Sequence, residues 1–291
     1  MPVVAPYIPT YASYTPYITA GEYTAAPTGV DVSQLVPGGT SVQNADALTN
    51  TIARASSWAD DYCRQVLAST VDTTVGYFRI NREGLIRVPV EFGPVVQVNS
   101  VSVGYTPSTV TALTDLTDVW IQRKVVTVPV FTSIPILQPS YNGRWMGSRL
   151  FTTVQYVNGY ANTLTATATL VGGSTLVGVS SLGVIAGMGL TIYDPGATEL
   201  VVVLSVVGNT ITTVTPMRFA HGVGVSISAM PPSIKQAVIF YTSALIKTRG
   251  SESFEMPGYG AQPSKGVPME EDGLQEIGLA QELLEPFRRV S

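Results

Sequence analysis

The sequence predicts an α+β fold: a helical core with a small antiparallel sheet, an inserted all-β barrel or sandwich module, and an extended N-terminal arm. Three observations lead to this prediction: two long stretches with helical periodicity, many short stretches rich in Val and Thr, and a proline-rich beginning. The chain has 291 residues, of which 45% are hydrophobic, so it can bury one large core or two modest ones.

The first 43 residues are predicted to form an extended arm. Six prolines interrupt this segment, and proline blocks both helices and interior strands. Tyrosines are amphipathic and enriched where protein surfaces meet, so docking onto a neighbouring subunit and plain disorder both remain open. The tyrosines predicted to dock on a neighbour are Tyr7, Tyr11, Tyr14 and Tyr17.

Helical periodicity marks two long segments and one short one. Residues 44–68 repeat apolar side chains at steps of four and three, with Asn44 or Asp46 available as a cap. A second helix is predicted over 232–248, because proline is tolerated in a first turn and the residues that follow are apolar on most sides. A short helix near 271–285 has an acidic start and a basic end, which suit the helix dipole.

Short strands are predicted between these helices, separated by turn residues. Those in the first half are 73–80, 85–88, 95–103, 119–128 and 150–157. Pro89 and Pro129 should fall at strand ends or edges, where a missing N–H does little harm. Six more follow without a helix between them, at 164–170, 175–179, 190–193, 199–207, 210–214 and 223–228.

These patterns divide the chain into four parts. The arm spans 1–43, and the core combines 44–160 with 230–250. Residues 161–229 are predicted to be a self-contained β module inserted between a strand and a helix, which requires only that its two ends lie close together. A linker and the C-terminal helix occupy 251–291.

Composition argues against several classes of function. Charged residues make up 12% of the chain, about half the usual share, so Ser, Thr, Gly and Tyr must cover much of the surface. Such surfaces suit subunits that hide area against neighbours. The net charge is −4 and no basic residue precedes Arg54, whereas nucleic-acid binders show basic clusters. The start lacks the features of a signal peptide, so we expect a protein made in a reducing cytoplasm, without a membrane span.

Candidate catalytic residues are few. His221 is the sole histidine, and a lone His at a turn is more often structural than catalytic. Cys63 is the sole cysteine and lies beside an apolar helical stripe, so we expect a packed, inert thiol and no disulfide. Asp194 and Glu199 flank a turn of the inserted module, which leaves a glycosidase or calcium site open. We find no catalytic constellation and predict no metal and no cofactor.

The order of several motifs resembles the head-tail connector (adaptor) proteins of tailed bacteriophages. These motifs are the helix ALTNTIARASSWADDYCRQVL, the strand-turn stretch LIRVPVEFGPVVQVNSVSV, the strand end YVNGY and the helix start PPSIKQAVI. They cover roughly 44–105, 150–160 and 230–250. The chain departs from the compact pattern of this family in its long N-terminal arm and in the β module that separates YVNGY from PPSIKQAVI.

The resemblance implies a structural virion protein of the neck, assembled in the host cytoplasm, and not an enzyme. Family members form a homo-oligomeric ring, commonly twelvefold, between the portal above and a neck or tail-completion protein below, and genome DNA passes through the ring. A terminal segment reaches the portal in this family, which makes the C-terminal tail the candidate here, although the tail can equally fold back onto its own core. The predicted portal contacts are Ile277, Leu283, Leu284, Phe287, Arg288 and Arg289.

Other interpretations stay open on the sequence alone. One is a different tail-completion, neck or decoration protein, with the β module facing outward. Another is a binding protein whose β module recognises a carbohydrate, and a third is a hydrolase that uses Asp194 and Glu199. For the connector interpretation the mild negative charge is favourable, because a conduit that neutralises no phosphates lets DNA pass without specific binding.

Overall fold

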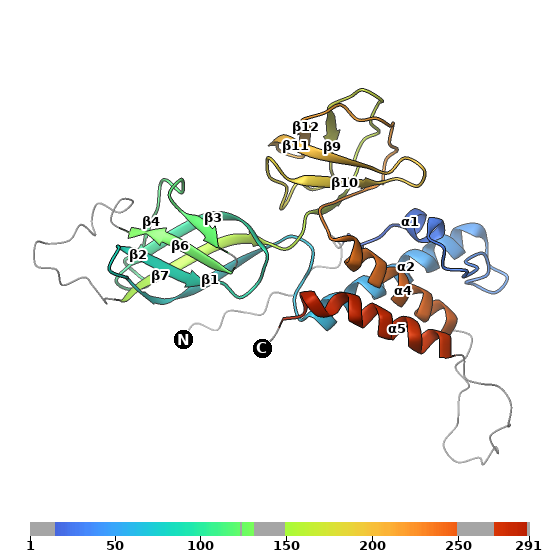
Figure 1. Ribbon diagram of the computed structural model, residues 1–291, viewed down its shortest axis with the longest axis horizontal. Coiled ribbons are helices and arrows are strands. Elements are labelled where there is room, and N and C mark those ends of the chain that lie inside the picture. The colour runs from blue at the N-terminus through green and yellow to red at the C-terminus, as the bar shows by residue number, and fades with distance from the viewer. Residues whose placement is uncertain (1–14, 123, 131–148, 249–270, 290–291) are drawn as a thin grey trace, which may run out of the picture.

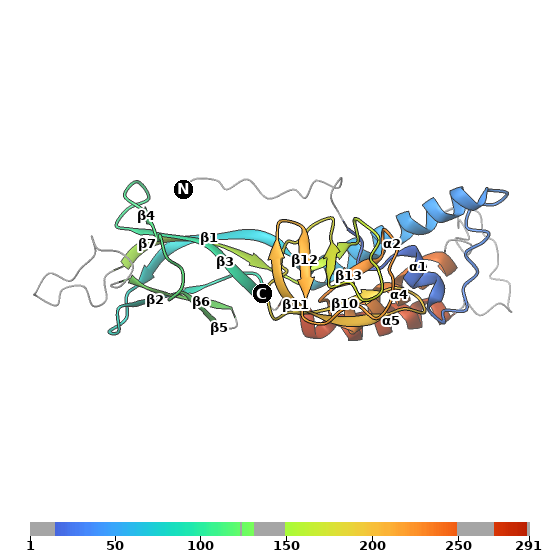
Figure 2. The same cartoon turned by 90° about the horizontal axis from the view of Figure 1, so that it is seen from above.

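The computed structural model describes residues 15–122, 124–130, 149–248 and 271–289 of the chain. It has an α+β fold of helices and antiparallel sheets, arranged in three units with separate hydrophobic cores. Figures 1 and 2 show a lobe of strands at one end, helices at the other, and a smaller β module beside the helices. In the described part of the chain, no helix is both long and apolar enough to cross a lipid bilayer.

The longest helix is α2 (Ser41–Cys63), which carries the predicted periodic apolar face. It begins earlier than expected because Thr40 and Gln43 form a capping box, in which each side chain accepts a hydrogen bond from the backbone N–H of the other. The predicted cap Asn44 has a different role. Its side chain accepts a hydrogen bond from the backbone N–H of Val36 at 2.7 Å and so holds the preceding loop.

The prediction of an extended arm is wrong for the part that begins at residue 15. A short helix, α1 (Ala20–Ala25), forms there because Thr19 and Glu22 make a second capping box. Tyr17 and Tyr23 on either side of its start are fully buried in the core of the same chain. The prolines of this segment lie outside the helix, so they do not prevent it.

The helical lobe is completed by the C-terminal half of the chain. Helix α4 (Pro232–Thr248) has the predicted bounds, and α5 (Glu271–Leu284) continues into a 3-10 turn (Glu285–Phe287). Helices α2 and α4 meet through Trp58 and Tyr241, whose rings stack with centroids 3.8 Å apart. Buried side chains from α2, α4, α5 and the segment around α1 form one core: Ile18, Leu48, Ile52, Ala55, Ala59, Ile234, Ala237, Val238, Ala280 and Leu284.

The β lobe consists of two sheets with a core of their own. The first has the order β1-β7-β3-β4: β1 (Thr70–Arg79), β7 (Arg149–Asn158), β3 (Val95–Gly104) and β4 (Thr111–Ala112). The second has the order β2-β6-β5: β2 (Leu85–Pro89), β6 (Val125–Pro129) and β5 (Trp120–Gln122). Pro89 and Pro129 each end a strand, as expected. The predicted strand 119–128 is instead a pair of strands, because the chain turns at Lys124.

The β module is a curled six-stranded sheet. Its order is β8-β13-β10-β11-β12-β9: β8 (Asn162–Leu164), β13 (Ser226–Ser228), β10 (Gly189–Tyr193), β11 (Glu199–Val207), β12 (Thr210–Thr213) and β9 (Thr175–Val177). The two edge strands also approach each other, since Val179 N–H donates to the Leu164 carbonyl at 2.9 Å. The sheet therefore bends toward a barrel around a core that includes Leu190, Ile192 and Ile227.

Candidate functional site: a polar junction between helices and sheets

The stretch YVNGY is the point where the β lobe, the helices and the β module meet. Gly159 has a φ of 87°, and a side-chain carbon there would lie 2.3 Å from the carbonyl oxygen of Ala68. Glycine is therefore required by both the backbone conformation and the close approach. The next residue, Tyr160, donates its N–H to the Leu67 carbonyl at 2.8 Å, so β7 is tied to the end of the α2 segment.

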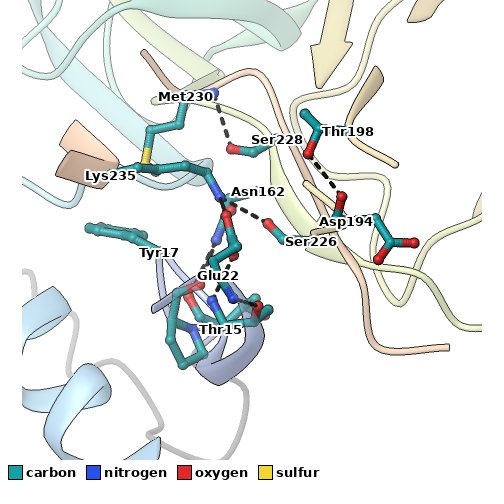
Figure 3. A network of polar contacts seen from close by, with 12 residues as sticks. Thr15, Tyr17, Glu22, Asn162, Asp194, Thr198, Ser226, Ser228, Met230 and Lys235 are labelled. Carbon is teal, nitrogen blue, oxygen red and sulfur yellow. Dashed lines mark hydrogen bonds and ion pairs between the residues drawn. The ribbon is translucent and has the colours of Figure 1, made fainter. Parts of the chain in front are cut away.

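Lys235 is the charged centre of this junction (Figure 3). Its ammonium donates to Glu22 Oε1 at 2.6 Å and to Ser226 Oγ at 3.0 Å, and it lies 3.8 Å from the centroid of the Tyr193 ring. Only 4% of Lys235 is exposed, so burial lowers the pKa of its amine, while the Glu22 carboxylate opposes that shift. The contact joins α1 to α4 and the β module, although Glu22 and Lys235 are 213 residues apart in the sequence.

The segment before α1 is anchored at the same junction. The Asn162 side chain on β8 donates to the Pro16 carbonyl at 3.1 Å. The Tyr17 hydroxyl donates to the Asp60 carboxylate on α2 and accepts the N–H of Leu67 at 3.2 Å. This tyrosine therefore acts within its own chain, which corrects the prediction that Tyr17 docks on a neighbour. Tyr7, Tyr11 and Tyr14 lie outside the described residues.

A cavity of about 270 Å³ opens beside Lys235. Its lining includes apolar groups from α1 and α4, together with Tyr193 and Thr198 of the β module. The charged groups that face it, Lys235 and Glu22, are already paired with each other. This arrangement fastens three segments together and offers no open charge to a ligand.

His221 lies between two carboxylates inside the β module. Its Nδ1 is 3.0 Å from Asp194 Oδ2, its Nε2 is 2.8 Å from Glu199 Oε1, and only 2% of the residue is exposed. Glu199 also accepts the backbone N–H of Arg218 at 2.9 Å. Although burial raises the pKa of Glu199, the hydrogen bonds from Arg218, His221 and Phe219 outweigh it, so the net shift is downward.

These contacts argue against the glycosidase and calcium options for Asp194 and Glu199. Both carboxylates point at His221 and pin the 215–222 loop against β10 and β11, instead of facing a substrate. Among the described residues, no group of three or more His, Cys, Asp or Glu side chains is arranged to hold a metal ion. The sequence groups Asp194 with Glu199 around one turn, but nothing in its spacing shows that the turn of His221 meets them.

Cys63 is buried at the end of α2. Burial raises the pKa of its thiol to about 12, with Asp60 and Glu285 adding to the shift. Its Sγ lies 3.9 Å from the Leu284 carbonyl of the C-terminal helix. A thiol with so little thiolate character at neutral pH is inert, which agrees with the structural role expected for it.

The C-terminal tail packs onto its own chain, which is one of the two arrangements that the sequence left open for it. Leu284 is fully buried in the helical core, and Leu283 and Phe287 are partly buried against the same core. Arg289 pairs with Glu91 of the β lobe at 2.6 Å. Arg288 pairs with Glu285 at 3.6 Å, and Ile277 is half-buried on α5. An amphipathic helix looks the same in sequence whichever apolar surface it covers.

Some residues of the junction have sequence patterns from which their roles could have been predicted. The spacing of Thr19 and Glu22 is that of a capping box, which marks a helix start despite the surrounding prolines. Lys235 is the only charged residue in the first half of an otherwise apolar helix, and such an isolated charge needs a partner when it is buried. The identity of that partner follows only from the fold.

Comparisons with known proteins leave this chain without an assigned family. No family model and no curated protein matches it. Among solved structures it is similar to a chain in the neck of an empty GTA particle computed with C6 symmetry. That match has 12% sequence identity and a TM-score of 0.35, and it covers 94% of this chain and 95% of that chain. A TM-score of this size does not establish a common fold.

Proposed function

We propose that this chain is a structural virion protein, a head-to-tail adaptor that forms a ring beneath the portal and a conduit for genome DNA. The observation that carries the proposal is the presence of exposed apolar faces on both β units of a chain with only 12% charged residues. Large exposed apolar patches mark interaction sites, and a ring subunit covers such faces with copies of itself. The sequence motifs that resemble phage connectors give the same class of protein.

The outer face of β1 illustrates this kind of surface. Val71, Val75 and Tyr77 alternate along this edge strand and are 42%, 51% and 51% exposed. Tyr77 also meets Phe151 edge-on, with ring centroids 5.3 Å apart. Aromatic and aliphatic side chains grouped on a surface are typical of the centre of a protein–protein interface, and the exposed Arg79 lies at the end of this face.

The polar junction supports an adaptor in a second way. It holds the helices, the β lobe and the β module together through the Lys235–Glu22 pair and the turn at Gly159. A subunit that transmits contacts from the head to the tail needs such fixed connections between its parts. We assign no catalytic activity and no cofactor to it, and its place is the neck of the virion.

The proposal also includes a partner protein on each side of the ring. The portal would lie on one side and a neck or tail-completion protein on the other, with twelve copies as the expected ring. Because Leu284 and Phe287 are turned toward the helical core, the accessible part of the tail is the exposed side of α5, which includes Leu279, together with Arg288 just after the 3-10 turn. DNA would pass without specific binding, since a mildly acidic ring attracts few phosphates.

Cryo-electron microscopy of the purified chain mixed with its portal tests this function. We expect closed rings with the outer faces of β1 and β11 (Glu199–Val207) covered by neighbouring subunits. A matched control is Val75→Asp, which places a charge on the β1 face without touching the core. Particles in which both faces remain in contact with water, together with a monomer at every concentration, would refute the adaptor. Binding at another level of the virion would indicate a tail-completion or decoration protein.

A further inference from the structure

Among the residues that the structure describes, the outer face of the β module is covered by its own chain on one side only. Paired residues on neighbouring strands share a face, and one such row runs from Asn162 through Ser228 and Thr191 to Leu200. At the start of this row Asn162 binds the Pro16 carbonyl, and Ser228 accepts the N–H of Met230 at 3.1 Å (Figure 3). At its end Leu200 is 68% exposed.

Strand β11 continues this uncovered surface. Val202 and Leu204, which share the outer face of the strand with Leu200, are 41% and 57% exposed. The alternate residues Val201 and Val203 point inward and belong to the core of the module. A strand that is apolar on both faces is typical of a sheet that is buried on both faces. The inner face has its cover within the module, and the outer face needs one from elsewhere.

The N-terminal segment has the composition and the position to supply that cover. Residues 1–14 (MPVVAPYIPTYASY) contain no charged side chain and carry three tyrosines. They precede Pro16, which is held at the same outer face by Asn162. Fully extended, fourteen residues span roughly 46 Å, far more than the roughly 14 Å that separates four neighbouring strands. Within one copy, however, α1 and the Lys235 contact occupy the face next to this anchor.

We propose that residues 1–14 of one copy dock on the outer face of β11 in the neighbouring copy. This inference rests on the proposed ring, because a contact between two different surfaces of one subunit, repeated with a rotation that closes, gives a ring. Leu200, Val202 and Leu204 form the acceptor face, and the tyrosines of the segment are the anchors. Proline lacks a backbone N–H and cannot join a sheet ladder at that position, so a segment with prolines at positions 2, 6 and 9 suits a contact that lies across the strand without adding a new one.

Cysteine cross-linking between two separately purified variants tests the contact. Tyr11→Cys and Val202→Cys are mixed under the conditions that give rings, oxidised, and weighed intact by mass spectrometry. We expect a disulfide-linked heterodimer, and the native Cys63 stays out of the reaction because it is buried. The matched control replaces Val202→Cys with Val75→Cys, a position on the β1 face that is 51% exposed against 41% for Val202, and should give no such product.

A second measurement checks the energetics. Deletion of residues 1–14 and the double change Leu200→Ser/Leu204→Ser should each raise the dissociation constant for self-association by about tenfold or more. Combining them should add little, because both remove the same contact. Circular dichroism establishes that the serine variant is folded, which is expected for two exposed positions.

The outcomes separate this inference from the proposed function. Rings that form normally without the heterodimer would overturn the docking of the segment and leave the adaptor standing. A disulfide that forms only when both cysteines are in one chain would also overturn it, because the segment would then cover its own sheet. Failure to form rings under any condition, with the portal included, would overturn the adaptor itself.

Discussion

At the residue scale, Lys235 and Glu22 form a buried ion pair at the place where α1, α4 and the β module pack together, although the chain has few charged residues. The pair is almost completely buried, and its geometry is supported by Ser226 and by the Tyr193 ring. A buried ion pair contributes little net stability compared with an apolar pair, but it penalises any arrangement that separates the two charges. We infer that it fixes how α1, α4 and the β module are placed against one another.

Glu22→Gln is therefore expected to destabilise the protein by about 3 kcal/mol, because it leaves the Lys235 ammonium buried without its counter-charge. Urea unfolding followed by circular dichroism measures the change. The control is Glu276→Gln, which breaks the more exposed Lys247–Glu276 pair of 2.8 Å and should cost about 1 kcal/mol or less. Equal losses of unfolding free energy in the two variants would show that removing a charge from the buried Lys235–Glu22 pair is no more costly than removing one from the more exposed pair.

Glu199 makes the β module sensitive to acid. Its pKa is lowered in the folded chain, so folding favours the ionised form. The stabilisation is fully present above the ordinary value of 4.5 and is lost as the pH falls below it, through the lower pKa of the folded state. Hydrogen exchange of the β10–β11 amides should therefore speed up over this range in the natural chain.

In Glu199→Gln the β10–β11 amides should exchange faster at pH 7 than in the natural chain. Acidification should destabilise this variant less, so the exchange rates of the two proteins should converge as the pH falls. The reason is that the glutamine has no charge to lose in this range. Asp115→Asn is the control, because Asp115 is a loop residue whose acceptor contacts are with the neighbouring Thr117. A constant difference between the Glu199 variant and the natural chain at all pH values would contradict the prediction.

At the scale of elements, the long periodic helices and most strands could be predicted from sequence, because their patterns reflect one buried face. Helix α4 has the predicted bounds, and β11 does as well. Helix α1 was missed because six residues are too few for a periodic signal, and the prolines on either side of it suggested an arm. The split of 119–128 into β5 and β6 was missed because both strands are apolar and the turn between them is short.

The candidate site was less predictable than the fold. Its contacts join turns and termini that are far apart in sequence, such as Lys235 with Glu22, and periodicity carries no information on such pairs. The motif YVNGY did point to the junction, since the glycine in it turned out to be required. The tail was ambiguous for a physical reason, because the face that packs on α2 and α4 would suit a partner protein equally well.

Gly159→Ala tests the junction at this scale. A methyl group there would clash with the Ala68 carbonyl oxygen and would also occupy a positive φ, so we expect a loss of about 3 kcal/mol or more. Gly172→Ala is a matched control with a φ of 78° and nothing within 4 Å, and it should cost only about 1 kcal/mol. Thermal unfolding compares the two. Similar losses would mean that the backbone conformation matters and the close approach does not.

At the scale of the whole molecule, the described residues form three small cores, joined through contacts that leave two outer apolar faces uncovered within this part of the chain. Each core is closed by its own elements, so the exposed residues on β1 and β11 are not needed for the units to fold. Their exposure has a cost in solubility that the low charge of the chain makes worse. Both features make sense together if the faces are buried when subunits assemble.

Self-association should then carry the signature of apolar burial. Because the exposed side chains on the faces of β1 and β11 are mainly apolar, the dissociation constant should change by less than about threefold between 0.05 and 0.5 M salt, and association should strengthen on warming from 10 to 25 °C. Sedimentation velocity at several concentrations measures both trends. Val75→Asp and Leu204→Asp should each weaken association, whereas Arg87→Gln, on the outside of β2, should leave it unchanged. If self-association instead weakened steeply with salt, the contact would depend on charged groups and not on the two apolar faces.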